Sequence, residues 1–427
     1  MASCGLDFGT SNTTLGLATA NGPRLAPLED ARTTVPSAVF YGRQGGLAIG
    51  RAAMARYVAG EDGRLMRSLK SVLGSPLIAE RTQLGRRSIG FAEIIGDFLK
   101  VVRQRAETAQ GAALDAVVLG RPVFFVDDDD AANARAEEAL CAIARSIGFA
   151  DVSCQFEPIA AALDYEQQVV REEIALIADI GGGTSDFSIV RLGPERRHRP
   201  DRSADILAND GVRIGGTDFD RRLSLGVVMP LLGYRSPMIR PGRDVPSGYF
   251  HELATWSSIN NLYTAQTLRE LKEVRREAAR PELIDRLARV IEEQRGHSLA
   301  MQAEEAKIEL ASHETAMLTL GWLETGLEAR ADRDGLIAHT GELATRIARR
   351  ITNCLQQAGL AAGDVDALFL TGGSTRLAHV RSAILAALPG AHVVEGDTFG
   401  SVGTGLAVEA ANRYGASTAR PRAPALG

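Results

Sequence analysis

Lysine and cysteine are both scarce in this sequence, and each shortage narrows what the protein can be. The 427 residues include only four cysteines, Cys4, Cys141, Cys154 and Cys354. No two of them have the CxxC or zinc-knuckle spacing of a metal site. We therefore expect buried, reduced thiols, as in an intracellular protein, and neither a metal centre nor a disulfide framework.

Long apolar runs and basic tracts are also missing. No uncharged apolar stretch approaches the ~18 residues of a membrane span, and the N-terminus lacks the basic and apolar regions of a signal peptide. The formal net charge is −5, which makes nucleic acid a poor candidate partner. These absences predict a cytoplasmic protein that binds neither membrane nor nucleic acid.

Two stretches of the sequence share one plan and predict a duplicated α/β fold. GLDFGTSNTTLG (5–16) and IALIADIGGGTSDFSIV (174–190) each place an acid, Asp7 or Asp179, near the end of an apolar strand. A glycine turn with a threonine follows the acid, and then a second strand. The chain is long enough for two lobes, one for each copy.

This pattern suits a nucleotide triphosphate bound together with magnesium. Glycine turns let backbone N–H groups approach phosphate oxygens, and magnesium prefers carboxylates and water. Either motif alone is weak, because glycine turns between strands are common. The matched pair predicts a two-sided phosphate site, with Asp7 and Asp179 beside a hydrated magnesium ion.

Residues 225 to about 300 differ in character from the rest of the chain. Three prolines in RSPMIRPGRDVPSG predict an irregular loop, and apolar residues at helical spacing follow, with Pro281 at a helix start. We expect a helical subdomain attached to the second lobe. The acidic run at 127–130 is expected to start a helix rather than bind a metal. The small-residue, proline-rich stretch 413–427 is expected to be a disordered tail.

Six motifs in one order carry a resemblance to a known family. The two stretches above are similar to the phosphate motifs of the actin-like ATPase superfamily, and more closely to those of the seventy-kilodalton heat-shock chaperones (Hsp70, DnaK-type). EPIAAALDY (157–165) resembles that family's connecting motif, and RIGGTDFDRRL (213–223) its GGxDFD segment. EEAKIELAS (304–312) resembles its adenosine-binding helix, and LFLTGGSTRLAHVR (368–381) its adenosine motif.

The resemblance runs from residue 5 to about 410 and implies an architecture. It implies an α/β, actin-like ATPase fold of two ribonuclease-H-like lobes around a central nucleotide cleft. Lobe I would comprise 1–170 and 385–412, with a subdomain at about 38–95. Lobe II would comprise 171–384, with an enlarged helical subdomain at about 225–320.

The resemblance also implies a role for each matching residue. The implied catalytic residues are Lys70, Glu157, Asp179 and Thr184, with Asp7 and Asp179 at the magnesium ion. The residues implied to hold phosphate or nucleoside are Gly9, Thr10, Ser11, Asn12, Gly181, Gly182, Gly183, Gly215, Gly216, Glu304, Lys307, Gly372, Gly373, Ser374 and Arg376.

Lys70 has special weight among these residues, because only four of the 48 basic residues are lysines. The resemblance places it at the γ-phosphate and the attacking water, and it places Glu157 near the attacking water. The implied reaction is slow, magnesium-dependent hydrolysis of ATP to ADP by in-line attack of water, with lobe closure coupled to the nucleotide. The plain alternatives are a surface lysine on a short helix for Lys70 and a solvated helix face for Glu304 and Lys307.

Three departures from the family qualify this interpretation. The match stops near Ala411, and the few residues left give no room for a peptide-clamping domain. The segment from Thr217 to Glu304 is longer than in the family. Ala311 replaces a usual serine in the adenosine helix, and FGSVGTGLA replaces a usually acidic segment. A nucleotide-binding part without a clamp and with an enlarged tip resembles the YegD-like branch of the family.

Other functions use the same superfold. A filament-forming actin-like protein shares the phosphate patterns, but GGSTR and DFDRRL favour the chaperone branch. A small-molecule kinase would need a catalytic base beside an acceptor pocket, for which no residue is a clear candidate, and a nucleotide sensor without turnover stays open. We expect an unidentified protein partner or client, with the 225–300 segment as one candidate contact surface.

Overall fold

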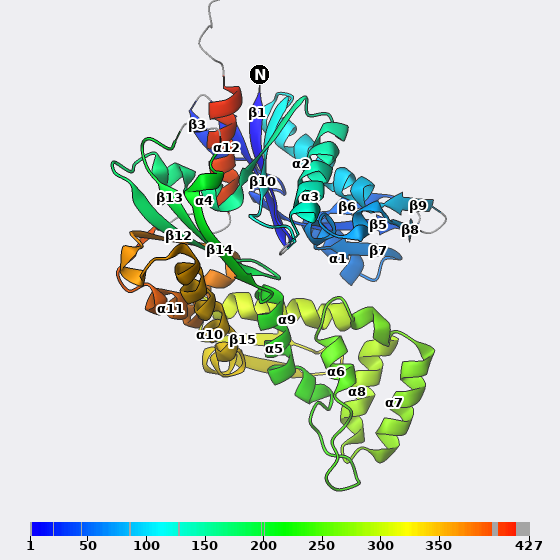
Figure 1. Ribbon diagram of the computed structural model, residues 1–427. Helices are drawn as coiled ribbons and strands as arrows, with labels where there is room; N and C mark the ends of the chain where they lie inside the picture. Colours follow the sequence, from blue (N-terminus) through cyan, green and yellow to red (C-terminus); the bar gives the residue numbers. More distant parts are fainter. Residues whose placement is uncertain are drawn as a thin grey trace, which may run out of the picture.

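The computed structural model of the chain describes residues 2–19, 21–43, 45–84, 87–126, 129–197, 199, 201–394 and 400–415. These residues form a mixed α/β architecture with two larger sheets and three small ones (Figure 1). None of the helices among them is long and apolar enough to cross a membrane.

The first sheet has the strand order β11-β10-β1-β2-β3, with β4 beside β2. Strand β1 runs antiparallel to β2 and parallel to β10, and β10 is parallel to β11. The bounds are β1 Ser3–Phe8, β2 Asn12–Thr19, β3 Gly22–Leu25, β4 Thr34–Pro36, β10 Ala116–Arg121 and β11 Asp151–Phe156.

The second sheet repeats this plan in the order β14-β13-β12-β17-β18. Strand β12 is antiparallel to β13 and parallel to β17, and β17 is parallel to β18. The bounds are β12 Glu173–Ile180, β13 Ser185–Leu192, β14 Ile206–Val212, β17 Ala367–Thr371 and β18 His392–Val394. Asp7 in β1 and Asp179 in β12 each occupy the position before the last residue of equivalent strands. The topology thus confirms the duplication predicted from the two glycine motifs.

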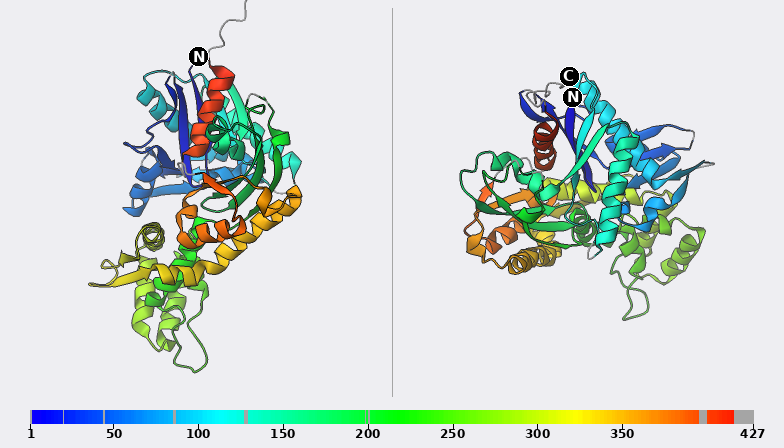
Figure 2. Two further views of the ribbon diagram at one scale, coloured as in Figure 1. Left: turned by 90° about the vertical axis from the view of Figure 1, so that its left-hand side faces the viewer. Right: turned by 45° about the horizontal axis from the view of Figure 1, so that its top comes forward.

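Two helices, α4 (Glu157–Glu166) and α12 (Ser401–Tyr414), share an apolar core with strands of both sheets. Figure 2 shows α12, in red, beside the blue strands of the first sheet. This approach is very close: a Cβ on Gly5 would lie 2.3 Å from the carbonyl carbon of Leu406, and one on Gly16 would lie 2.2 Å from the carbonyl oxygen of Gly403. Two glycines of the opening motif therefore allow α12 to dock on the β1–β2 hairpin.

Further helices cover the sheets. Helices α2 (Phe91–Gln110) and α3 (Asp130–Ser146) contribute to the core of the first sheet, and α10 (Arg333–Ala358) and α11 (Ala378–Ala387) to that of the second. The carboxylate of Asp129 accepts a hydrogen bond from the N–H of Ala132 at 2.8 Å and so caps α3. The acidic run therefore starts a helix, as predicted, although 127 and 128 lie outside the described residues.

Small elements lie between β4 and α2, in the range where a subdomain is expected (about 38–95). Strands β5 (Ala38–Gly42), β6 (Leu47–Ile49) and β7 (Gly63–Arg67) make one sheet, against which α1 (Gly50–Val58) packs. Strands β8 (Arg81–Leu84) and β9 (Arg87–Gly90) make a separate hairpin.

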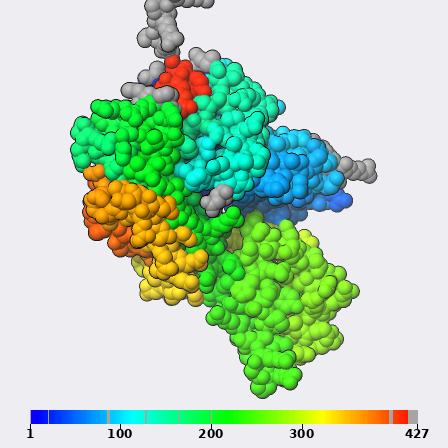
Figure 3. Space-filling view, in the orientation of Figure 1, coloured from blue at the N-terminus to red at the C-terminus, as the bar shows by residue number. Residues whose placement is uncertain are grey.

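The helical segment predicted after residue 225 stands out as a light-green block in Figures 1 and 3. Its helices are α6 Gly248–Leu253, α7 Ala265–Glu277 and α8 Pro281–Glu292, between α5 Gly216–Val227 and α9 Gly296–Leu310. The hairpin β15 (Thr315–Thr319) and β16 (Glu328–Asp332) follows. Buried residues of α6 and α8, such as Phe250 and Leu287, belong to the same apolar core as the second sheet. The block is therefore part of the second lobe rather than a separate domain.

Two predicted boundaries need correction. Strand β18 pairs with β17, so the chain still belongs to the second sheet at Val394 and returns to the first lobe after it, not at 385. Helix α12 continues to Tyr414, so the first two residues of the predicted tail are helical. Residues 416–427 lie outside the described residues.

Candidate functional site

Four charged side chains meet near the ends of β1 and β12. Asp7 and Asp179 come from these strands, Glu157 is the first residue of α4, and Lys70 lies in a 3-10 turn, Leu69–Val72. Lys70 Nζ lies 2.5 Å from Glu157 Oε1, and only 11% and 15% of the two side chains are exposed. Lys70 is therefore not a solvated surface lysine.

Burial and mutual repulsion disturb the ionisation of this acidic cluster. The pKa of Asp7 is raised to about 8, first by burial and then by Glu157, against the opposing effect of Lys70. The pKa of Asp179 is raised to about 7 by burial, then by Asp186 and Glu157. Burial by itself would lower the pKa of Lys70, but the surrounding carboxylates raise it. The cluster holds more negative charge than one lysine balances, so it suits a bound cation.

Asp186 belongs to this cluster and was missed by the sequence analysis. It is the register partner of Asp179 across β12 and β13, and it accepts a hydrogen bond from Thr184 Oγ1 at 2.8 Å. In the first copy the partner of Asp7 is Thr14. The available signal was the hairpin itself, because a short turn between two strands places their side chains opposite one another.

The two predicted phosphate turns approach each other. A Cβ on Gly182 would lie 1.7 Å from Ser11 Oγ, and one on Gly9 would lie 2.2 Å from the carbonyl oxygen of Asn12. Ser37 holds the first turn: its Oγ donates to the carbonyl of Gly9 at 2.6 Å, and its N–H donates to the carbonyl of Ser11 at 2.8 Å. Glycine at positions 9 and 182 leaves room for this approach and keeps backbone N–H groups accessible to an anion.

The second turn is fixed to the start of α5. The N–H of Gly216 donates to the carbonyl of Gly181 at 2.9 Å, and a Cβ on Gly215 would lie 2.5 Å from the nitrogen of Gly183. The GGxDFD segment and the second glycine turn are thus packed backbone against backbone.

Residues predicted to hold the nucleoside also meet at Gly216. Lys307 Nζ donates to the carbonyl of Gly216 at 3.3 Å and pairs with Asp220 Oδ1 at 2.8 Å. A Cβ on Gly216 would lie 3.2 Å from Ser374 Oγ. Burial raises the pKa of Asp220 to about 6, with Lys307 opposing and Glu304 adding to the rise. Lys307 is buried, so it does not belong to a solvated helix face, and Asp220 is a second acid that the sequence analysis missed.

The last predicted segment runs from Gly372 to Arg376, and its first residue lies beside Asp179. Gly372 has a φ of +79°, and a Cβ there would lie 2.3 Å from the carbonyl oxygen of Ile180 and 2.7 Å from Asp179 Oδ1. Gly373 and Arg376 are exposed. Gly372 is required both for its left-handed backbone and for this close approach.

A cavity of about 60 Å³ borders the acidic cluster and is lined by Glu157, Asp179, Asp186, Thr371 and other residues. In the described part of the chain, no group of three or more acidic, histidine or cysteine side chains could hold a metal ion by itself. The two carboxylates of Asp7 and Asp179 nevertheless fit magnesium, because this ion retains water ligands and needs only one or two carboxylates from the protein. A larger groove of about 840 Å³, lined by residues of α1 and α2, does not include the charged cluster.

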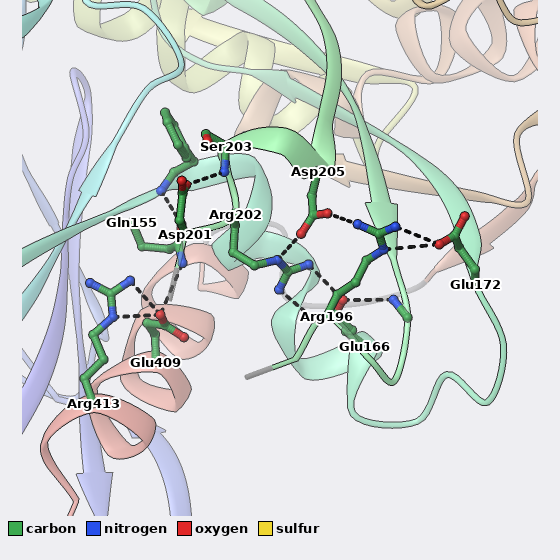
Figure 4. Close-up of polar contacts among 12 residues, drawn as sticks. Gln155, Glu166, Glu172, Arg196, Asp201, Arg202, Ser203, Asp205, Glu409 and Arg413 are labelled. Carbon is green, nitrogen blue, oxygen red and sulfur yellow. Dashed lines mark hydrogen bonds and ion pairs between the residues drawn. The ribbon is translucent and has the colours of Figure 1, made fainter. Parts of the chain in front are cut away.

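A buried ion cluster fixes the far end of α4 (Figure 4). Glu166, the last residue of α4, accepts two hydrogen bonds from Arg202 at 2.9 and 3.0 Å, and both side chains are buried. Arg202 also pairs with Asp205, which pairs in turn with Arg196. These contacts fasten α4, whose first residue enters the acidic cluster, to the segment between β13 and β14.

Two sheets of one topology, each with an acid and a glycine turn at the same strand end, define an actin-like ATPase fold. Within that class, the family can be named. A model of the Hsp70 family, described as "Hsp70 protein", matches residues 77–228 and 275–419, and the chain belongs to this family. Residues 229–274, between the two matched ranges, include α6 and most of α7.

Curated relatives support the same assignment. The chain is 26% identical over 401 residues to the chaperone protein HscA homolog of Chromobacterium violaceum, a match that covers 89% of this chain and 53% of the relative. It is 24% identical over 389 residues to the chaperone protein DnaK of Thermosipho melanesiensis, with 89% and 54% covered. The chain thus spans about half the length of these relatives. The family match disfavours the filament and kinase alternatives, and the YegD-like branch stays a prediction.

Proposed function

We propose that this chain binds ATP and ADP with magnesium and hydrolyses ATP slowly, as the nucleotide-binding part of a chaperone-like protein. The observation that carries the proposal is the buried Lys70–Glu157 pair beside Asp7 and Asp179, at the place where two glycine turns meet. Membership of the Hsp70 family supports it, because proteins of that family bind adenine nucleotides.

The proposed roles follow from the chemistry of each group. Backbone N–H groups of residues 9–12 and 181–184 bind phosphate oxygens, with the hydroxyl of Thr10 near the γ-phosphate. Magnesium, when bound through water to Asp7 and Asp179, supplies positive charge to the phosphates. Glu157 and Lys70 orient the attacking water, so that the protein contributes position and charge rather than covalent chemistry.

The nucleoside is proposed to bind beyond the second turn. Glu304 and Lys307 on α9 face the ribose, and the segment from Gly372 to Arg376 closes the base site, where a guanidinium can stack on the purine plane. The Lys307–Asp220 pair keeps the ammonium group beside Gly216 before any nucleotide arrives.

We further propose that nucleotide controls closure of the two lobes. The helical block touches the small subdomain of the first lobe: Tyr57 Oη lies 3.0 Å from His297 Nδ1, and the Arg67 guanidinium lies 4.4 Å from the centre of the Trp256 ring. Trp256 also packs against the buried cluster around Phe40. Opening for nucleotide exchange would break these contacts, which join residues more than 180 positions apart.

A protein partner is proposed to meet the outward side of the helical block. The charged residues of α7, including Glu270, Lys272 and Arg276, are exposed. A cross-linking reagent attached at position 272 should capture the partner, whereas the same reagent at Lys100, an exposed lysine on α2 of the first lobe, should not.

Magnesium-dependent ATP binding and turnover of the purified chain test the proposal. Lys70→Ala should lower the turnover rate by about 100-fold, because the group that helps to position water is lost. Lys272→Ala is the matched control, since Lys272 is an exposed lysine of α7 and should leave the rate unchanged. Equal turnover of wild type and Lys70→Ala would remove Lys70 from the mechanism. Binding without turnover in the wild type would indicate a nucleotide sensor, and no binding would overturn the proposal.

A further inference from the structure

Two of the four cysteines face each other. Cys141 on α3 and Cys154 on β11 have their sulfur atoms 3.4 Å apart. Both are partly exposed, whereas Cys4 and Cys354 are fully buried. The expectation of four buried thiols is therefore wrong for this pair, because the helix and the edge strand that carry it lie at the border of the first sheet.

The surroundings favour reaction at Cys141. Arg121 pairs with Glu137, which lies one helical turn before Cys141, and the guanidinium of Arg121 also lies 4.9 Å from the centre of the Phe156 ring. The pKa of Cys141 is lowered, chiefly by the hydrogen bond with Cys154 and further by nearby arginines, against burial and Glu137. A thiolate at Cys141 would therefore have a second thiol in contact and a cation nearby.

We propose that Cys141 and Cys154 are an oxidisable thiol pair, which peroxide converts to a reversible disulfide between α3 and β11. The Cys141 thiolate attacks a peroxide oxygen: an S–O bond forms, the O–O bond breaks, and the leaving hydroxide takes a proton to become water. The Cys154 sulfur then attacks the sulfenic sulfur, so that the S–S bond forms and a second water leaves. Two thiols and one hydrogen peroxide give one disulfide and two waters, and a dithiol reductant reverses the change.

The disulfide would stiffen a segment close to the acidic cluster. The sulfur atoms must move from 3.4 Å to about 2 Å apart, so α3 and β11 must approach or their side chains rotate. The other side of β11 is already tied to α12. Gln155 donates a hydrogen bond to Glu409 at 3.2 Å (Figure 4), and Arg413 donates one to the carbonyl of Cys154 at 3.1 Å. Oxidation would therefore link α3, β11 and α12 into one unit.

Peptide mapping of the intact chain tests the proposal without any mutation. Trypsin cleaves after Arg135, Arg145 and Arg171, so the two cysteines lie in adjacent peptides, 136–145 and 146–171. After a small molar excess of hydrogen peroxide, with alkylation of remaining thiols, we expect these two peptides to be linked and to separate on reduction. Peptides carrying Cys4 and Cys354 should be recovered alkylated.

Variants and a physical measurement complete the test. Cys154→Ser should give no linked peptide and should leave Cys141 as a sulfenic acid that dimedone traps, whereas Cys354→Ala should still form the link. The oxidised wild type should melt a few degrees higher than the reduced protein and exchange amide hydrogens of 130–157 more slowly. Two free, alkylated thiols after peroxide treatment, or a link that joins two different chains, would overturn the proposal.

Discussion

The cross-lobe contact at His297 should make the stability of this protein sensitive to acid. The side chain is 4% exposed, and its ring lies between Tyr57 of the first lobe and the backbone of Trp256. Because a carbonyl oxygen only accepts, Nε2 must donate to the carbonyl of Trp256 at 3.2 Å, which leaves Nδ1 free to accept from the Tyr57 hydroxyl. The contact therefore uses the neutral ring.

The size of the effect follows from the pKa. Burial lowers the pKa of His297 from 6.5 to about 4, with Arg67 adding to the decrease and the hydrogen bond to Trp256 opposing it. The tyrosines that touch the ring, Tyr57 and Tyr263, stay neutral in this range because burial raises the pKa of both.

Above pH 6.5 the folded and unfolded chains both carry a neutral ring, so His297 has no effect on the free energy of unfolding. Below pH 6.5 the ring of His297 is protonated in the unfolded chain, but it stays neutral in the folded chain until the pH falls to about 4. Stability is therefore lost as the pH falls, by about 2 kcal/mol at pH 5 and about 3 kcal/mol at pH 4.

The assay compares wild type with His297→Gln, whose amide can replace both hydrogen bonds without titrating. Urea unfolding between pH 7.5 and 4.5 gives the free energy of each protein, and the difference between the two should grow as the pH falls. Trp256 reports the protonation directly, because its ring centroid lies 4.6 Å from that of His297, and Trp322→Phe removes the second tryptophan. Parallel loss of stability in both proteins, or a fluorescence midpoint near 6.5, would refute the reasoning.

Two further predictions concern the glycine turns and the buried ions. Gly182→Ala should weaken ATP binding by about 10- to 100-fold with an unchanged melting temperature, because its Cβ would displace the Ser11 hydroxyl. Gly363→Ala, in a turn outside the predicted phosphate and nucleoside segments where a Cβ has open space, serves as the control in a calorimetric titration. If both variants bind alike, the close approach of the turns does not matter for the nucleotide. Arg202→Met should destabilise the fold by about 3–5 kcal/mol in urea unfolding, because two buried carboxylates lose their guanidinium. Arg276→Met, which removes an exposed ion pair, should lower the free energy of unfolding by less than about 1 kcal/mol. Equal losses in the two variants would show that burial does not cause the larger effect expected for Arg202→Met.

Much of the predicted phosphate-binding part of the site could be recognised from local sequence patterns. Asp7 and Asp179 each stand next to a glycine turn, and this pattern is visible in the sequence because strand, acid and turn are consecutive in the chain. Their equivalent places in two sheets of one topology follow from the same repetition. The family resemblance pointed to Lys70, and the rarity of lysine added weight to it, although only the fold brings Lys70 to Glu157, 87 positions away.

Other features of the site could not be read in this way. Asp186 and Asp220 looked like ordinary hairpin and helix residues, and their importance arises from the register opposite Asp179 and from the ion pair with Lys307. The lobe boundary lies after Val394 because β18 pairs with β17 of the second sheet, and the composition of the segment does not indicate this pairing.

The duplicated strands, the two glycine turns and the family motifs can be recognised in the sequence, because the residues of each lie close together in the chain. The contact of the helical block with the first lobe at Tyr57, and that of Cys141 with Cys154, are visible only in the folded protein. These contacts depend on how separate helices and strands pack, and apolar periodicity indicates which face of an element is buried but not which element it meets. Burial then changes their chemistry, since it is the surrounding protein that keeps His297 neutral.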